Sequence, residues 1–349
     1  MQTELTELVG CRYPIVQTGM GYVSGPRLVS ATAKAGGLGI IASATMSLPQ
    51  LASAIDEVRS VTEAPFGVNL RADAADAAQR VELIIDKGVK VASFALAPSE
   101  KLVARLRDAG VIVLPSVGAL RHAQKVAAWG AHAVVVQGGE GGGHTGSIPT
   151  GLLVPQIVDA VDIPVVAAGG FFDGRGLVAA LAYGACGIAM GTRFLLTSDS
   201  PVGQEVKRVY LSKSLSDTVV TTKVDGVPHR VLRTSFVDNL GRKGLLYALG
   251  NAARFRKLSG VSWARMLRDG RAMRHGRDLS WAQVLMAANT PMLLKAAMVD
   301  GRPDLGVMAS GQVVGLIDDL PSCAELIERI MAEAREVLER LNRTASLHR

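Results

Sequence analysis

Short apolar runs rich in valine, isoleucine and alanine recur along the first 195 residues and alternate with longer amphipathic segments. The eight runs cover residues 14–20, 37–43, 65–70, 89–96, 111–118, 131–139, 163–170 and 184–192. They are apolar along their whole length, which is typical of strands that are buried on both faces. The pattern therefore predicts a parallel sheet covered by helices.

The segments between these strands have the length and polarity of amphipathic helices. Predicted helices cover residues 24–35, 48–60, 74–87, 99–109, 120–129 and 175–183. Eight alternating units close more naturally into a barrel than they extend an open sheet, so we predict an α/β fold of the (β/α)8 TIM-barrel type. An open, doubly wound sheet is the alternative.

At 349 residues, the chain is longer than a minimal barrel. We expect residues 1–200 and 300–349 to form the barrel. Residues 201–299 are then a basic, mainly helical insertion that follows the eighth strand.

In a barrel of this kind the loops that follow the strands form the face that carries the active site. Glycines and polar residues gather at these points, namely residues 18–21, Asn69, Ser116, residues 137–146, Gly169, Gly170, Gly191 and Thr192. The last two loops, AAGGFFDGRG and MGTRF, predict a phosphate site, because glycine lets backbone N–H groups approach an anion closely. Any one of these glycines could simply turn the chain, but two loops at the expected places favour phosphate.

A second interpretation of the same region is a dinucleotide fingerprint at residues 174–179, between a strand and a helix. The match is weak, because eight barrel strands leave no separate unit for such a site.

The sixth predicted strand ends in VVVQGGEGGGHTG, whose glycines bring His144 to the rim of the barrel. Histidine can act there as a base, as a hydrogen-bond donor to an anion or as a proton shuttle near neutral pH. A turn residue that is hydrogen-bonded to the backbone is the alternative. We predict that His144 is catalytic, because it lies on the face where the fold places its chemistry.

Apolar residues make up 48% of the chain and charged residues 20%, which is typical of a globular protein. The first residues lack the basic start and apolar stretch of a secretory signal, and glycines interrupt the longest uncharged stretch, between Arg175 and Arg193. Cys11, Cys186 and Cys323 lack metal-ligand spacing. We therefore expect a reduced, cytoplasmic protein without a metal site or a membrane partner.

Positive charge is concentrated between Arg242 and Arg277, where ten Lys or Arg residues accompany one acid, Asp269. The net charge of this segment is +9, against +7 for the whole chain. Such a surface attracts a polyanion, and the phosphates of coenzyme A would use it. A solvated helix face, or a subunit contact in a homodimer, is the alternative. Nucleic acid is disfavoured, because the nearby aromatic residues equally suit the core of a small lobe.

Over essentially its whole length the chain resembles the FMN-dependent nitronate monooxygenase family. The matching pieces, in order, are PIVQTGMG, AKAGGLGIIAS, PFGVNL, residues 137–146, AAGGFFDGRGLVAALAYGA, MGTRFLLT and GVMASGQVVGLIDD. The resemblance implies a flavin enzyme that binds FMN at the mouth of the barrel.

The resemblance also implies roles for individual residues. Gly19 and Met20 are expected to line the flavin, and Asn69 and Gln137 to form hydrogen bonds with it. The residues expected on its phosphate side are Gly142, Gly169, Gly170, Gly191 and Thr192. His144 matches the histidine that serves the family as catalytic base or proton handler.

Two further groups of residues are expected at the substrate. Ser310, Gly311 and Gln312 match a late segment that returns to the mouth of the site, and Ser310 and Gln312 are its candidate contacts. The candidates in the basic segment are Arg254, Arg256 and Lys257.

Activity varies within the family more than fold does. HRVLRTSF, the basic segment and MAANTPMLLKA resemble an actinobacterial branch that acts on CoA thioesters of steroid C/D-ring remnants during sterol breakdown. This implies an oxidoreductase that introduces or reduces a C=C bond in a cyclic acyl-CoA, with FMN as cofactor and NAD(P) as a candidate electron partner. The alternatives are a nitronate monooxygenase that uses O2, an NAD(P)H:quinone reductase and a non-catalytic flavin-binding protein. The sequence departs from the nitronate-oxidising pattern at two places. One is Gly141, where those members usually have alanine, and the other is the insertion.

Overall fold

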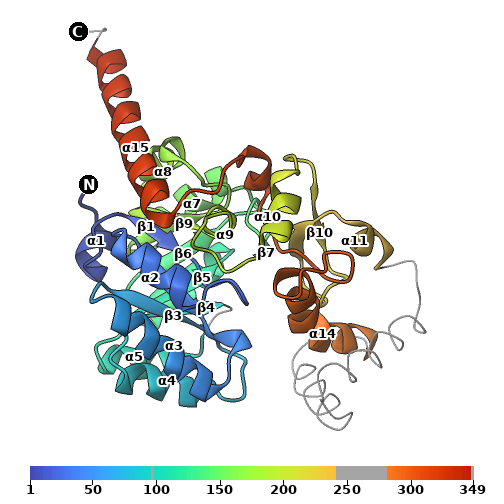
Figure 1. Cartoon of the computed structure of the whole chain (residues 1–349). Helices are drawn as coiled ribbons and strands as arrows, with labels where there is room; N and C mark the ends of the chain where they lie inside the picture. The colour runs from blue at the N-terminus through green and yellow to red at the C-terminus, as the bar shows by residue number, and fades with distance from the viewer. Residues whose placement is uncertain (96–97, 241–280, 347–349) are drawn as a thin grey trace.

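A closed barrel of eight parallel strands forms the centre of the computed structural model, which describes residues 1–95, 98–240 and 281–346 (Figure 1). The strands, in their order around the barrel, are β1 (Ile15–Gln17), β2 (Leu38–Ala42), β3 (Phe66–Arg71), β4 (Val91–Ala95), β5 (Ile112–Val117), β6 (Val134–Gln137), β8 (Val165–Ala168) and β9 (Gly187–Met190). Each lies within one of the eight apolar runs, apart from the one-residue extension of β3. The predicted barrel is therefore confirmed, and the open sheet is wrong.

The strands are apolar throughout because both of their faces are covered. Val16, Ile40, Val91, Val135 and Val166 belong to one buried cluster inside the barrel. Neighbouring residues along the strands face outward and pack against the surrounding helices in two further clusters. The short helix α1 (Glu4–Val9) contributes its apolar side chains to the inner cluster.

Helices follow the barrel strands in turn. They are α2 (Pro26–Lys34), α3 (Leu48–Val61), α4 (Ala77–Asp86), α5 (Glu100–Asp108), α6 (Leu120–Ala128), α7 (Thr150–Val158), α8 (Gly174–Ala182) and α9 (Thr192–Leu195), with a 3-10 turn η1 (Ser43–Thr45) after β2. Side chains of Ser47, Ser99 and Asp173 cap three of them by accepting a backbone N–H three residues further on. The six predicted helices are confirmed, whereas α7 and α9 were not predicted.

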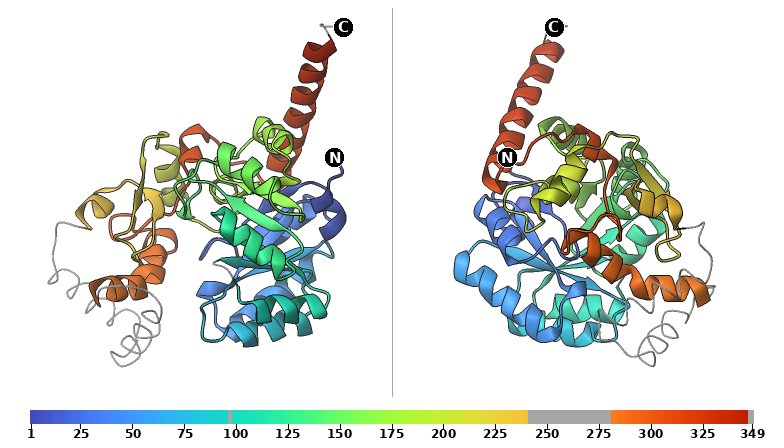
Figure 2. Two further views of the ribbon diagram at one scale, coloured as in Figure 1. Left: turned by 180° about the vertical axis from the view of Figure 1, so that it is seen from behind. Right: turned by 45° about the vertical axis from the view of Figure 1, so that its right-hand side comes forward.

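The last helix, α15 (Cys323–Ser346), returns the chain to the barrel. Its first half packs against α8 and α2, where Leu326, Ile327 and Ile330 join the same buried cluster as Leu177. Its second half projects beyond the barrel (Figure 2). Among the described helices, none combines the length and the apolar character that crossing a bilayer requires.

The described part of the chain between β9 and α15 departs from the barrel pattern and lies to one side of it (Figure 2). Its described elements are α10 (Gln204–Leu211), β10 (Thr218–Thr221), β11 (His229–Leu232), α11 (Ser235–Asn239), α14 (Trp281–Met298) and a 3-10 turn η2 (Gln312–Leu316). The extent of the insertion and its mainly helical character stay a prediction, and the antiparallel β10–β11 hairpin was not predicted. This part of the chain has a small apolar core of its own, made of Val224, Val231, Phe236, Val237 and Val307.

Candidate active site

The ends of the first, third and last barrel strands bring several predicted residues together. Gly19 lies against Asn69, so close that a Cβ atom at Gly19 would be 2.5 Å from the Cβ of Asn69. Asn69 is buried and donates from Nδ2 to Ser93 Oγ at 3.2 Å. A Cβ atom at Gly191 would lie 3.5 Å from the sulfur of Met20. These four predicted residues therefore share the mouth of the barrel.

The loops after β8 and β9 provide the features of an anion site. Gly169 and Gly170 adopt φ angles of +102° and +82°, which favour glycine. The backbone N–H groups of Gly170, Gly191 and Thr192 have no acceptor in the part of the chain that the structure describes. Unpaired N–H groups beside close-lying glycine backbone suit a phosphate. The residues present therefore fit the phosphate end of FMN.

Hydrogen bonds hold the loop between β6 and α7 at its base. The carboxylate of Glu140 accepts hydrogen bonds from the backbone N–H of Thr150 at 3.0 Å and from its hydroxyl at 2.7 Å. Gln137 Nε2 donates to the carbonyl oxygen of His144 at 2.8 Å. Glycine at position 141 leaves room for the Gln137 side chain, whose Cγ would lie 2.7 Å from an added Cβ. Gln137 thus supports the loop here, and its contact with a flavin stays a prediction.

The late segment returns to this mouth from the insertion. The backbone N–H of Gly311 donates to Thr192 Oγ1 at 2.9 Å, and that of Gln312 donates to the carbonyl oxygen of Glu140 at 3.0 Å. Ser310 is fully buried, and its hydroxyl donates to the carbonyl oxygen of Gly311. The structure therefore brings residues 310–312 to the other site residues. Their role toward substrate stays a prediction, and Arg254, Arg256 and Lys257 lie outside the described residues.

His144 lies in a two-residue strand, β7 (Gly143–His144), that pairs antiparallel with β11 of the insertion. His229 faces His144 in this ladder, and Arg230 faces Gly143. The guanidinium of Arg230 also donates two hydrogen bonds to the carbonyl oxygen of Gly139, at 3.0 and 2.8 Å. The glycine-rich loop is therefore held from the side of the insertion as well as from the barrel.

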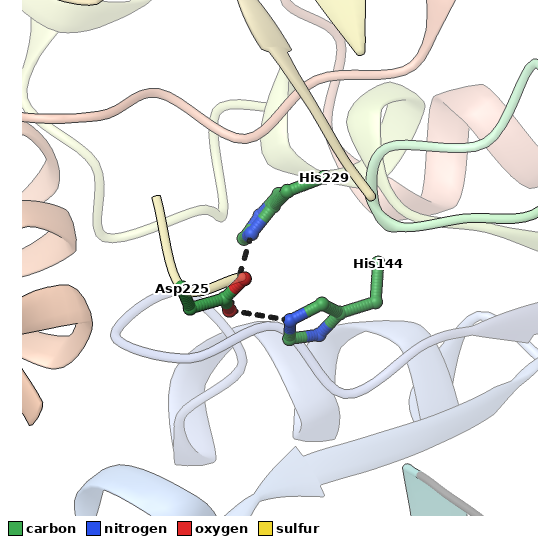
Figure 3. A group of neighbouring side chains, drawn as sticks. All are labelled: His144, Asp225 and His229. Atoms are coloured by element: carbon green, nitrogen blue, oxygen red, sulfur yellow. Dashed lines mark hydrogen bonds and ion pairs between the residues drawn. The ribbon is translucent and has the colours of Figure 1, made fainter. Parts of the chain in front are cut away.

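Asp225 lies between two histidines in this site (Figure 3). His144 Nε2 is 2.6 Å from Asp225 Oδ2, and His229 Nδ1 is 3.7 Å from the same oxygen. The two imidazole rings are 4.7 Å apart between centroids. The side chain of His144 is 43% exposed, whereas that of Asp225 is 10% exposed. His144 is therefore open to a substrate, and its partner is shielded.

Burial and the histidines act in opposite directions on the pKa of Asp225. Burial opposes ionisation, but the hydrogen bond from His144 and the charges of both histidines outweigh it and hold the pKa of Asp225 below its ordinary value. Burial lowers the pKa of His229, against the effect of Asp225, so His229 is neutral at neutral pH. Because an ionised carboxylate only accepts hydrogen bonds, Nε2 of His144 carries a proton and donates the hydrogen bond to Asp225.

Asp225 and His229 were not predicted as site residues. Asp225 and Gly226 lie in the connection between two short strands, and an Asp-Gly pair is a hairpin signal that could have indicated it. In the loop after β1, Tyr22 adopts a φ angle of +64°, a strained conformation for a non-glycine residue.

Comparison with known proteins identifies the family. The family model described as "Nitronate monooxygenase" matches residues 2–80 and 76–333. The chain belongs to the nitronate monooxygenase family. Within it, the chain is 64% identical over 341 residues to a Mycobacterium tuberculosis protein and 59% identical over 345 residues to one from Rhodococcus jostii. These matches cover 96% and 98% of both chains, and both relatives are named "(3aS,4S,5R,7aS)-5-hydroxy-7a-methyl-1-oxo-octahydro-1H-indene-4-carboxyl-CoA dehydrogenase".

Solved structures agree with this membership of the nitronate monooxygenase family. FabK from Thermotoga maritima superposes with a TM-score of 0.81 at 34% identity, over 98% of this chain and 99% of the other. Nitroalkane oxidase from Streptomyces ansochromogenes superposes with a TM-score of 0.77 at 28% identity, over 97% and 99%. The predicted resemblance is confirmed, and the protein is an oxidoreductase.

Replacing Gly142 with alanine tests how closely the late segment packs on the loop. The added Cβ atom would lie 2.5 Å from the backbone of Ser310 and Gly311. We expect Gly142→Ala to cost roughly 1–3 kcal/mol of stability, as overpacking does, and to lower the melting temperature. The control is Gly203→Ala, whose added Cβ meets nothing within 4 Å. Equal melting temperatures for the two variants would contradict the packing.

Proposed function

We propose that the protein is an FMN-dependent dehydrogenase of a cyclic, hydrindane-type CoA thioester. The observation that carries this proposal is the pair of relatives with that named activity, which match almost the full length of the chain at 64% and 59% identity. A shared fold alone does not indicate which substrate a protein uses, but identity at this level over almost the whole chain supports a shared substrate.

The proposed FMN site is the mouth of the barrel. The backbone N–H groups of Gly170, Gly191 and Thr192 would hold its phosphate, and Gly19 and Met20 would line the flavin ring. Asn69 would reach the ring from β3. When bound, FMN supplies the two-electron chemistry that amino-acid side chains lack, as acceptor of the hydride from the substrate's β-carbon. NAD(P) as the electron partner stays a prediction.

His144 is the proposed base. The thioester carbonyl makes the neighbouring α-hydrogen acidic, so its removal needs a base within reach of the α-carbon. Nε2 of His144 is engaged by Asp225 at 2.6 Å, which leaves Nδ1 as the atom that takes this proton. The exposed position of the ring admits the substrate. Orientation of the acyl group and exclusion of water are the protein's other contributions.

The CoA part of the substrate is proposed to bind the basic segment. Arg254, Arg256 and Lys257 are the proposed phosphate contacts, because the net charge of +9 between residues 242 and 277 matches a polyanion better than a small monoanion. Residues 201–299 would then act as one unit that receives the CoA moiety beside the barrel.

Nitronate oxidation is a second candidate function. It is favoured by the family model itself and by the likeness to the Streptomyces nitroalkane oxidase. The exposed His144 would serve that reaction as well, but the basic segment would have no role in it.

Anaerobic absorbance spectra of the purified protein distinguish the two functions. We expect the flavin absorbance to bleach when a hydrindane-type acyl-CoA is added, because the bound cofactor accepts two electrons. Propionate nitronate is the comparison ligand. Bleaching by the nitronate alone would contradict the proposed function and support the second candidate.

Substitution of the base gives a separate test. We expect His144→Ala to retain bound flavin and to lose turnover by roughly 10²–10⁴-fold, the usual contribution of general acid–base catalysis. Turnover of the acyl-CoA and flavin absorbance at equal protein concentration are the measurements. Loss of the flavin together with activity would show that His144 is structural.

A further inference from the structure

Besides the Arg230–Gly139 hydrogen bonds and the contact of the His144 and His229 rings, four contacts join the segment from Asp225 to Arg230 to the His144 loop. Two are the ladder pairs of β7 with β11. A third is the hydrogen bond from the backbone N–H of Thr145 to the carbonyl oxygen of Pro228 at 3.1 Å, and the fourth is the Asp225 side chain on the His144 ring. The backbone contacts set the position of Asp225 relative to His144, so the side-chain contact follows from the fold of the insertion.

We propose that Asp225 is a positioning residue, which the insertion supplies to hold His144 with Nε2 engaged and Nδ1 free for proton transfer. This inference rests on the proposed function of His144 as base. It assigns the insertion a part in completing the active site, in addition to its proposed contact with coenzyme A.

The chemistry of the pair supports this role. A carboxylate that accepts the Nε2 proton fixes one tautomer of the ring and leaves the lone pair of Nδ1 available. When Nδ1 takes the proton from the substrate, the ring becomes positively charged, and the adjacent carboxylate stabilises that charge. No hydrogen bond to Nδ1 of His144 occurs within the described residues. The reacting nitrogen is therefore opposite the one that Asp225 holds.

The surroundings of Asp225 keep its carboxylate in place. Asp225 Oδ1 accepts the backbone N–H of Val227 at 3.2 Å, within the same turn. His229, only 3% exposed, lies on its other side and is neutral near neutral pH. Val224, the preceding residue, is fully buried in the small core of the hairpin. The carboxylate is thus fixed by the turn, by the core and by a buried ring.

Arg71 of β3 and Arg230 of β11 are the charged groups of the elements around the pair. Arg71 at the end of β3 is bonded to Asp73, and the pKa of Arg71 is raised by that bond and, more weakly, by the charge of Asp225. Arg230 lies in β11 and holds the loop through Gly139. Neither arginine replaces the contact that Asp225 makes with the ring.

A bound metal ion is a different interpretation of the same three side chains, because two histidines and a carboxylate form a common ligand set. The distance of 2.6 Å between His144 Nε2 and Asp225 Oδ2 is a hydrogen-bond length. Ligand atoms about 2.0–2.2 Å from one ion would lie farther apart than this in a tetrahedral site. The geometry therefore favours the hydrogen-bonded arrangement.

The decisive experiment is nitrogen NMR of the histidine rings in the full-length, flavin-loaded protein, which shows which ring nitrogen carries the proton. The chain has six histidines, and the signal of His144 is the one that disappears in His144→Gln. In the wild type we expect the His144 proton on Nε2, and in Asp225→Asn we expect it to move to Nδ1, because the asparagine amide can donate to Nε2 whereas the carboxylate only accepts. The matched control is Asp238→Asn, which removes an exposed carboxylate from the same insertion.

Turnover gives the second readout. We expect Asp225→Asn to lower acyl-CoA turnover by roughly 100-fold, within the range of general acid–base effects, while flavin stays bound and Asp238→Asn is unchanged. Asp225→Glu should recover part of the activity by restoring a carboxylate.

The outcomes separate this inference from the proposed function. A His144 proton that moves from Nε2 in Asp225→Asn supports the positioning role even when the wild-type protein does not oxidise the acyl-CoA, in which case the proposed substrate is wrong. A His144 proton that stays on Nε2 in Asp225→Asn overturns the positioning role, whatever happens to turnover. His144 ring signals that change on removal or addition of zinc would overturn it in favour of a metal site.

Discussion

The pairing of β7 with β11 joins a loop of the barrel to the segment inserted after its last strand. Only two residues of β7 take part, yet the arrangement of the site depends on them. The ladder sets His144 opposite His229, and the turn before His229 then carries Asp225 to the ring of His144. The barrel side holds the backbone of this loop through Gln137 and Glu140, but among the described residues only Asp225 forms a hydrogen bond with the His144 ring. The insertion therefore supplies the order that the proposed acid–base role of His144 requires.

At the rest of the mouth of the barrel, too, hydrogen bonds join segments that lie far apart in the chain. Thr192 follows the last barrel strand, and its hydroxyl accepts the backbone N–H of Gly311. Glu140 belongs to the sixth loop, and its carbonyl oxygen accepts the N–H of Gln312. The insertion follows β9 and α9, and the segment that comes after it returns to the mouth of the barrel before α15 begins. Each return contact limits how far the loops can move, which suits a site that must hold a flavin and a substrate in fixed relation.

The barrel could be predicted from the sequence because its strands are buried on both faces, and burial makes the whole run apolar. Gly19, Asn69, His144 and Thr192 could be placed at one rim because the fold puts all strand ends on one side. Asp225 could not be placed, since 81 residues separate it from His144 and their contact depends on a two-residue strand that has no periodic pattern. The hairpin was not predicted because its strands are short and partly polar, although the connection between them contains an Asp-Gly pair.

The central claim is that His144, held by the insertion, removes the α-proton of a cyclic CoA thioester. The most direct measurement is the loss of α-deuterium from a labelled hydrindane-type acyl-CoA, followed by mass spectrometry under anaerobic conditions with the flavin already reduced. Further oxidation of the substrate is then blocked, and exchange at the α-carbon reports on the base alone. The account predicts rapid exchange with the wild-type protein and little with His144→Ala. Equal exchange rates for the two proteins would contradict it.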